Sequence, residues 1–101
     1  MFSIIYTTTS TKDEAKKIAK ALVKEKLAAC VNIFPIYSIY EWDGIQENDE
    51  FALLIKTTTK TKEKIEKRIK EMHEYETPCI ISFNIDGGSI DFLEWIKLKT
   101  I

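Results

Sequence analysis

Apolar and polar residues alternate along the chain with two different periods, which predict strands and helices. Residues 2–9 (FSIIYTTT) are rich in β-branched and aromatic side chains, which favours a first strand. Residues 10–26 place apolar side chains three and four positions apart and lysines between them, which predicts an amphipathic helix. The apolar positions are Ala15, Ile18, Ala19, Leu22 and Val23. Thr11 followed by Glu14 has the spacing of a capping box at the start of this helix.

A long second strand is expected over residues 28–42, which stay apolar and aromatic for about three times the usual strand length of ~5 residues. Pro35 interrupts the stretch, and because proline lacks the N–H of a regular ladder, a bulge or bend is expected there. Residues 43–49 (DGIQEND) are expected to form a turn, since Asp-Gly is a strong hairpin signal. Residues 50–58 are the expected third strand.

The second half of the chain repeats the alternation of helix and strand. A helix is expected over residues 60–75, capped by Thr59 or Thr61, with a narrow apolar face formed by Ile65, Ile69 and Met72. Residues 77–85 are the expected fourth strand, and Ser89 is the expected cap of a short last helix. The order β-α-β-β-α-β predicts one α+β domain over residues 1–101. This domain has the ferredoxin-like arrangement of two helices on one face of an antiparallel sheet, with an extra C-terminal helix.

Side chains alternate between the two faces of a strand, so the pattern also assigns a helix-covered and an open face. The covered set is expected to be Val31, Ile33, Phe51, Leu53, Ile55, Cys79, Ile81, Phe83 and Ile85. The open set is expected to include Cys30, Asn32, Glu50, Ala52, Leu54 and Lys56. A partly apolar open face, together with an overlong strand that has a free edge, predicts self-association.

Composition excludes several classes of function. The chain has 15 basic and 16 acidic residues and a pI of about 5.9, which argues against a nucleic-acid partner. No apolar run approaches the ~20 residues that span a bilayer. Cys30 and Cys79 are too few for a disulfide scaffold, and no signal peptide is evident, so we expect a reducing, cytoplasmic location.

Three segments resemble one known family. Residues 27–57 (LAACVNIFPIYSIYEWDGIQENDEFALLIKT), 73–81 (HEYETPCII) and 91–96 (DFLEWI) are similar, in order and spacing, to motifs of the CutA divalent-cation tolerance proteins. The resemblance implies a ferredoxin-like subunit, an interlocked homotrimer similar in architecture to P-II signalling proteins, and binding of copper or another divalent cation. Glu41, Glu74 and Cys79 depart from the family pattern.

The resemblance also implies candidate site residues near subunit boundaries. The candidate metal ligands are Cys30, His73 and Glu50, and the candidate pocket residues are Lys56, Tyr75 and Trp42.

Each candidate has a structural alternative. Cys30 can be a small buried side chain at an interface, and His73 can cap the second helix or bond across an interface. Glu50 and Lys56 can form an ion pair, and the two aromatic residues can anchor an interface.

These features predict a trimeric metal-responsive binding protein without catalysis or an organic cofactor. No nucleophile is paired with a base, no HExxH motif is present, and no glycine-rich loop is placed to hold a phosphate. Two alternatives stay open: a P-II-like module that binds an organic effector, and a trimeric scaffold for a partner protein.

Overall fold

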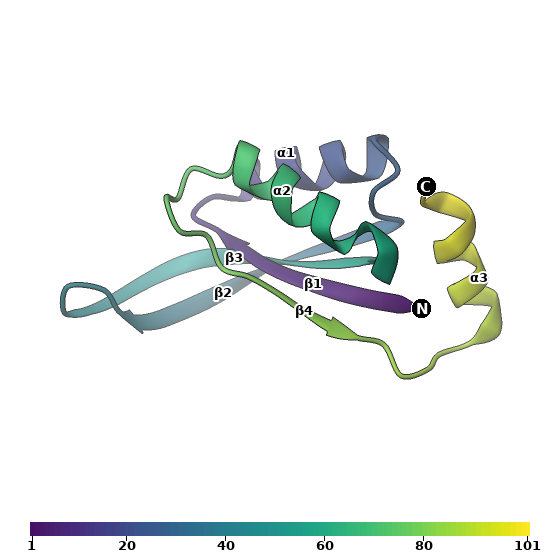
Figure 1. Ribbon diagram of the computed structural model, residues 1–101. Coiled ribbons are helices and arrows are strands. Elements are labelled where there is room, and N and C mark those ends of the chain that lie inside the picture. Colours follow the sequence, from purple (N-terminus) through teal and green to yellow (C-terminus); the bar gives the residue numbers. More distant parts are fainter.

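The computed structural model describes all residues, 1–101, and its elements follow the predicted order (Figure 1). The strands are β1 (Phe2–Thr9), β2 (Cys30–Glu41), β3 (Ile45–Thr58) and β4 (Ile80–Asn84). The helices are α1 (Lys12–Lys24), α2 (Lys62–Met72) and α3 (Ile90–Lys99), and a 3-10 turn, η1 (Thr59–Thr61), precedes α2.

The four strands form one antiparallel sheet in the order β2-β3-β1-β4. Helices α1 and α2 lie side by side over one face, and α3 lies beyond the end of the sheet, beside the N-terminus (Figure 1). The core between the helices and the sheet is built from fully buried aliphatic side chains, chiefly Ile5, Ile18, Leu22, Leu53, Ile55, Ile65 and Ile69. The open face has no helix along its length.

Helix α1 forms as the sequence predicts. The Thr11 hydroxyl accepts a hydrogen bond from the Glu14 N–H at 3.1 Å, which satisfies one of the unpaired donors of the first turn. Ile18 and Leu22 are completely buried, whereas Val23 is 43% exposed and lies at the margin of the apolar face.

Helix α2 is shorter than expected, because the chain leaves helical geometry at His73 (ψ 141°). Thr61 occupies its N-cap position, but its hydroxyl makes no capping bond and instead lies 3.1 Å from both Leu27 O and Thr58 O. Ile65 and Ile69 are buried as predicted. None of the helices has the length and apolar character required to cross a membrane.

The β2–β3 hairpin corrects two expectations. Its register runs unbroken from Cys30 opposite Lys56 to Glu41 opposite Ile45, and Pro35 pairs regularly with Phe51, so the expected bulge is absent. An edge strand tolerates proline, because it has a ladder partner on one side only. The turn also differs from the expected residues 43–49: it is formed by residues 42–44, with Asp43 (φ 54°) and Gly44 (φ 95°) at positive φ, and β3 starts at Ile45.

Strand β4 presents the opposite face from the one expected. Ile80 packs against the core, whereas Ile81 is 56% and Phe83 49% exposed on the open side. Pairing with β1 decides the orientation, since Ile81 lies opposite Tyr6, one position along from the core residue Ile5. The assignment of Cys79 to the core is therefore wrong, and its side chain is exposed.

The burial difference along α1 gives a direct test of the core. We expect Ile18→Ala to lower the free energy of unfolding by about 2–5 kcal/mol, because it leaves a cavity under α1. Val23→Ala, on the same helix, should change it by less than ~0.5 kcal/mol. Urea unfolding at one protein concentration measures both, and equal losses would contradict the position of α1.

Candidate functional site

A groove opens on the helix-free face, between the β2–β3 hairpin and the segment that joins α2 to β4. It has a volume of about 900 Å³. Five aromatic residues line it: Tyr6, Tyr37, Tyr40, Trp42 and Tyr75. Three glutamates, Glu50, Glu74 and Glu76, also line it, and no lysine, arginine or histidine does. The groove therefore combines aromatic walls with negative charge.

Glu50 is the most enclosed charged group of the groove. It lies in β3, opposite Ile36, and is only 6% exposed. The Tyr75 hydroxyl donates to Glu50 Oε2 at 2.6 Å, while Glu50 Oε1 accepts no hydrogen bond from the chain and is not sealed from the groove. Burial, and then this hydrogen bond, raise the pKa of Tyr75 far above that of a free tyrosine. Tyr75 is thus a fixed neutral donor.

Both ring nitrogens of His73 bond to the backbone, and Glu14 Oε2 lies 3.4 Å from Nδ1. The His73 side chain is buried; Nε2 lies 2.6 Å from Thr8 O, and Nδ1 accepts from the Tyr75 N–H at 3.0 Å. Since a carbonyl oxygen only accepts, Nε2 carries the proton and the imidazole is the neutral tautomer. Glu14 Oε2 accepts from the Glu74 N–H at 2.9 Å, which fixes the same turn. His73 thus positions the segment that carries Tyr75.

Cys30 and Lys56 lie far from this groove. They pair with each other on β2 and β3, six residues along β3 from Glu50, which is roughly 20 Å for an extended strand. Cys30 is half-buried, and Lys56 Nζ lies 5.6 Å from the centroid of the Phe92 ring in α3. Glu50 and Tyr75 are thus in contact, and Trp42 lines the same groove at the turn of the hairpin. Cys30 and Lys56 lie at the other end of the open face.

No three histidine, cysteine, aspartate or glutamate side chains of the chain gather closely enough to hold a metal ion. Glu50 and Cys30 are separated along the sheet, and His73 has no free ring nitrogen. The metal-ligand assignment of these three residues therefore stays a prediction, and it requires a contribution from outside one chain.

Sequence reasoning missed several residues of the groove. Cys79 lines it beside Glu50; burial, and then the Glu50 charge, raise the pKa of its thiol. The sequence pattern missed Cys79 because it assigned the wrong face of β4 to the core. Tyr37 and Tyr40 were recognisable only as part of an aromatic hairpin, because their approach to the segment after α2 depends on tertiary packing.

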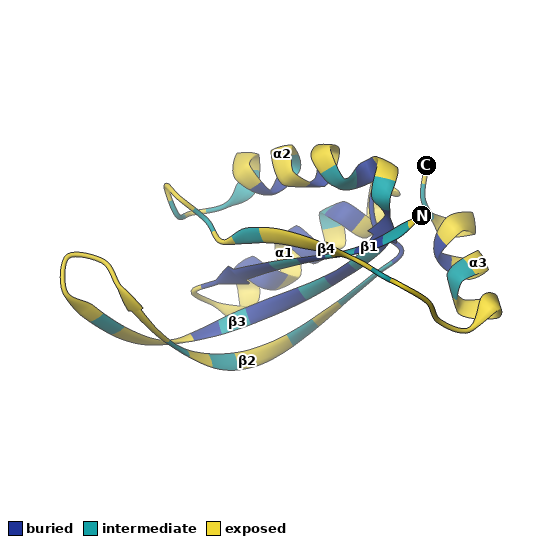
Figure 2. Ribbon diagram, turned by 60° about the horizontal axis from the view of Figure 1, so that its bottom comes forward, coloured by how far each residue is buried: buried dark blue, intermediate teal, exposed yellow.

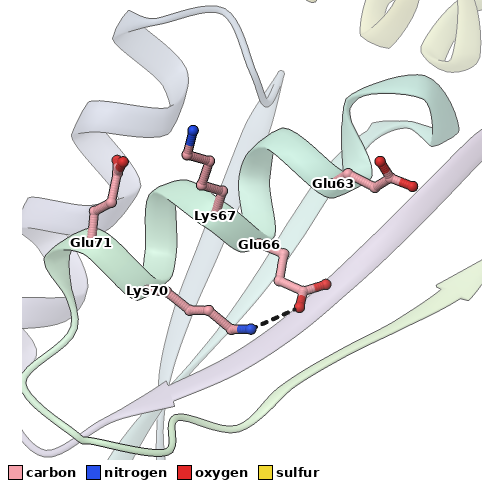
Figure 3. Close-up of a pocket in the computed structure, with 5 residues that line it drawn as sticks. All are labelled: Glu63, Glu66, Lys67, Lys70 and Glu71. Atoms are coloured by element: carbon pink, nitrogen blue, oxygen red, sulfur yellow. Dashed lines mark ion pairs between the residues drawn. The ribbon is translucent and has the colours of Figure 1, made fainter.

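A second hollow lies on the outer face of α2 and is lined entirely by charged side chains (Figure 3). These are Glu63, Glu66, Lys67, Lys70 and Glu71, and Lys70 Nζ lies 3.1 Å from Glu66 Oε2. Ion pairs this exposed contribute little energy. This is the solvated helix face that the alternating lysines and glutamates predict.

Comparisons with known proteins agree over nearly the whole chain. The family described as "CutA1 divalent ion tolerance protein" matches residues 3–99. This chain belongs to the CutA family. The divalent-cation tolerance protein CutA of Archaeoglobus fulgidus is 45% identical to it over 97 residues, which is 95% of each chain. That of Thermus thermophilus is 42% identical, covering 99% of each chain.

Solved CutA structures show the same fold. The periplasmic divalent cation tolerance protein CutA of A. fulgidus superposes with a TM-score of 0.96, at 44% identity and 98% coverage of both chains. CutA1 of Oryza sativa has a TM-score of 0.96 at 39% identity, covering 99% of this chain and 94% of that chain. The chloroplastic CutA protein of Arabidopsis thaliana is 43% identical, and this chain spans 54% of its length. The predicted family is confirmed.

The Glu50–Tyr75 contact can be tested against a matched exposed pair. Tyr75→Phe leaves a buried carboxylate without its donor and should lower the free energy of unfolding by about 1–3 kcal/mol. Tyr37→Phe removes the exposed 2.9 Å bond from the Tyr37 hydroxyl to Glu47 and should cost less than ~0.5 kcal/mol. Denaturant unfolding compares the two; equal effects would show that the Glu50 contact has no special weight.

Proposed function

We propose that this CutA chain is a homotrimeric, cytoplasmic protein that binds copper or another divalent cation and takes part in the response to metal ions, without catalysis. The observation that carries the proposal is the family match over residues 3–99, with relatives named divalent-cation tolerance proteins. The proposed subunit is ferredoxin-like, in keeping with the strand order β2-β3-β1-β4 and two helices on one face.

Incomplete burial supports the trimer. Only 23 of 101 residues are buried within the single chain. Phe34, Ile81 and Phe83 are exposed on the open face, and the outer part of the hairpin is exposed well beyond the body of the sheet (Figure 2). Apolar surface of this extent is typical of interfaces, and the free edges of β2 and β4 can each accept a strand from another chain.

Metal binding, in this proposal, uses ligands from more than one subunit. A single chain gathers no three ligands, whereas a subunit boundary can bring Cys30 of one copy toward Glu50 or His73 of another. Thiolate is a favoured ligand of copper, and carboxylate and imidazole complete sites of mixed type. His73 would have to give up the Tyr75 N–H bond to expose Nδ1, so Cys30 and Glu50 are the more available groups.

Copper titration by calorimetry on the metal-free protein tests this proposal, with the oligomer mass checked by light scattering in the same buffer. We expect one trimer to take up copper in a fixed ratio, and Cys30→Ser combined with His73→Ala to abolish saturable binding. Cys79→Ser, which removes the other thiol, is the matched control and should bind as the wild type does.

Two outcomes would contradict the proposal. A wild-type protein that takes up copper only weakly and without saturation has no defined site. A double variant that keeps both its fold, seen by circular dichroism, and its copper affinity would show that Cys30 and His73 are not the ligands.

A further inference from the structure

We propose that Lys56 of one subunit pairs with Glu50 of the next, so that each boundary of the proposed trimer contains one buried ion pair. This inference rests on the trimer of the proposed function and adds to it the contact that orients the subunits. One copy of the chain supplies the carboxylate of the pair, and another copy supplies the ammonium group.

Glu50 and Lys56 are the only charged residues among the strand positions of the open face. The register gives every other residue of each strand to this face, and the remaining positions are apolar or neutral. Several of the apolar ones, including Phe34, Ile81 and Phe83, are exposed in the single chain. A second copy that covers them also removes both charges from water. Because a buried charge without a partner is costly, each of the two needs an opposite charge inside the interface.

Neither charge is fully satisfied inside one chain. The Tyr75 hydroxyl donates to Glu50 Oε2 at 2.6 Å, and Glu50 Oε1 is left without a donor. No basic residue lines the groove onto which Glu50 opens. Lys56 belongs to none of the ion pairs of the chain, and its Nζ atom lies 5.6 Å from the centroid of the Phe92 ring. Both groups can therefore accept a partner from another copy.

The two charges cannot meet within one chain, because six residues separate them on the same face of β3. This spacing corresponds to roughly 20 Å in an extended strand, which is far beyond the reach of a lysine side chain. They can meet between copies, when the Lys56 end of one open face lies against the Glu50 end of another. In a closed ring each subunit uses Glu50 at one boundary and Lys56 at the other, so every charge has a partner.

The pairing is compatible with the metal site proposed above. Cys30 lies directly opposite Lys56 in the ladder of β2 and β3. A contact that brings Lys56 to Glu50 of the next subunit therefore also brings Cys30 to the same boundary. Lys56 is then the counter-ion of Glu50 in the metal-free trimer, and a divalent cation bound to Glu50 would take its place.

A double-mutant cycle on the metal-free protein tests the pairing. The readout is the chain concentration at which half of the chains are trimeric, measured by light scattering in a fixed urea concentration that partly dissociates the wild type. Glu50→Gln keeps an acceptor for the Tyr75 hydroxyl, and it and Lys56→Gln should each raise this concentration at least ~10-fold. The double variant should raise it no further than the larger single effect, because the second substitution removes a group whose partner is already lost.

A matched control and an exchange of charges complete the test. Lys70→Gln removes a lysine from the outer face of α2 (Figure 3), should leave the trimer unchanged, and should not alter the effect of Glu50→Gln. Glu50→Lys and Lys56→Glu each place like charges at the boundary and should abolish the trimer at concentrations where the wild type is trimeric. The two reversals combined should recover both the trimer mass and the fold, which circular dichroism follows in every variant.

Two results would overturn the pairing while the trimer stands. In the first, the double glutamine variant shows the product of the two single effects, as residues roughly 20 Å apart do when no contact couples them. In the second, the combined charge reversal fails to recover the trimer. A wild-type protein that is not trimeric by light scattering contradicts the proposed function itself, and with it the pairing, so the mass separates the two failures.

Discussion

The open face of this CutA chain depends on one hydrogen-bonded register, the pairing of β2 with β3. The ladder continues from Cys30–Lys56 near the body of the sheet to Glu41–Ile45 at the turn, with Pro35 accommodated at the outer edge. Because the register holds over this length, the hairpin extends past the other two strands and carries Tyr37, Tyr40 and Trp42 with it. Tyr40 lies on the same face of the hairpin as Glu50, and a slip of β2 by one residue would turn Tyr40 to the opposite face.

The other wall of the groove is fixed by contacts of the segment after α2. His73 bonds through one ring nitrogen to the Thr8 carbonyl and through the other to the Tyr75 N–H, while Glu14 holds the Glu74 N–H. These bonds bring Tyr75 to Glu50 and leave one carboxylate oxygen open. The only histidine thus acts first as a structural residue, and any metal role has to compete with two backbone hydrogen bonds.

Local pattern predicts the elements whose apolar residues fall on one face. Helix α1 is such an element, since Thr11 caps it and Ile18 and Leu22 are buried. The same prediction from local pattern fails for β4. Ile80 on one face and Ile81 and Phe83 on the other are all apolar, so only the pairing with β1 decides which face of β4 meets the core.

The candidate site was also predictable from the sequence only in part. The family resemblance identified Glu50, Tyr75 and Trp42, which the fold assembles around the groove. The resemblance placed Cys30 and Lys56 in the same group of candidates. Only the strand register shows that these two residues lie at the other end of the open face. The hydrogen bond from His73 to Thr8 joins residues 65 positions apart and leaves no local signature.

The same topology has a consequence for the order in which the chain folds. The hairpin joins residues that begin four positions apart at Glu41 and Ile45, whereas β1 and β4 join residues as distant as Ser3 and Asn84. Closing the shorter loop costs less chain entropy, so the hairpin can form early and β4 docks late. Pulse-labelling hydrogen exchange would show this as early protection of hairpin amides. On this pathway the edge beside the groove is the last part of the sheet to close, and a newly made subunit exposes it for longest.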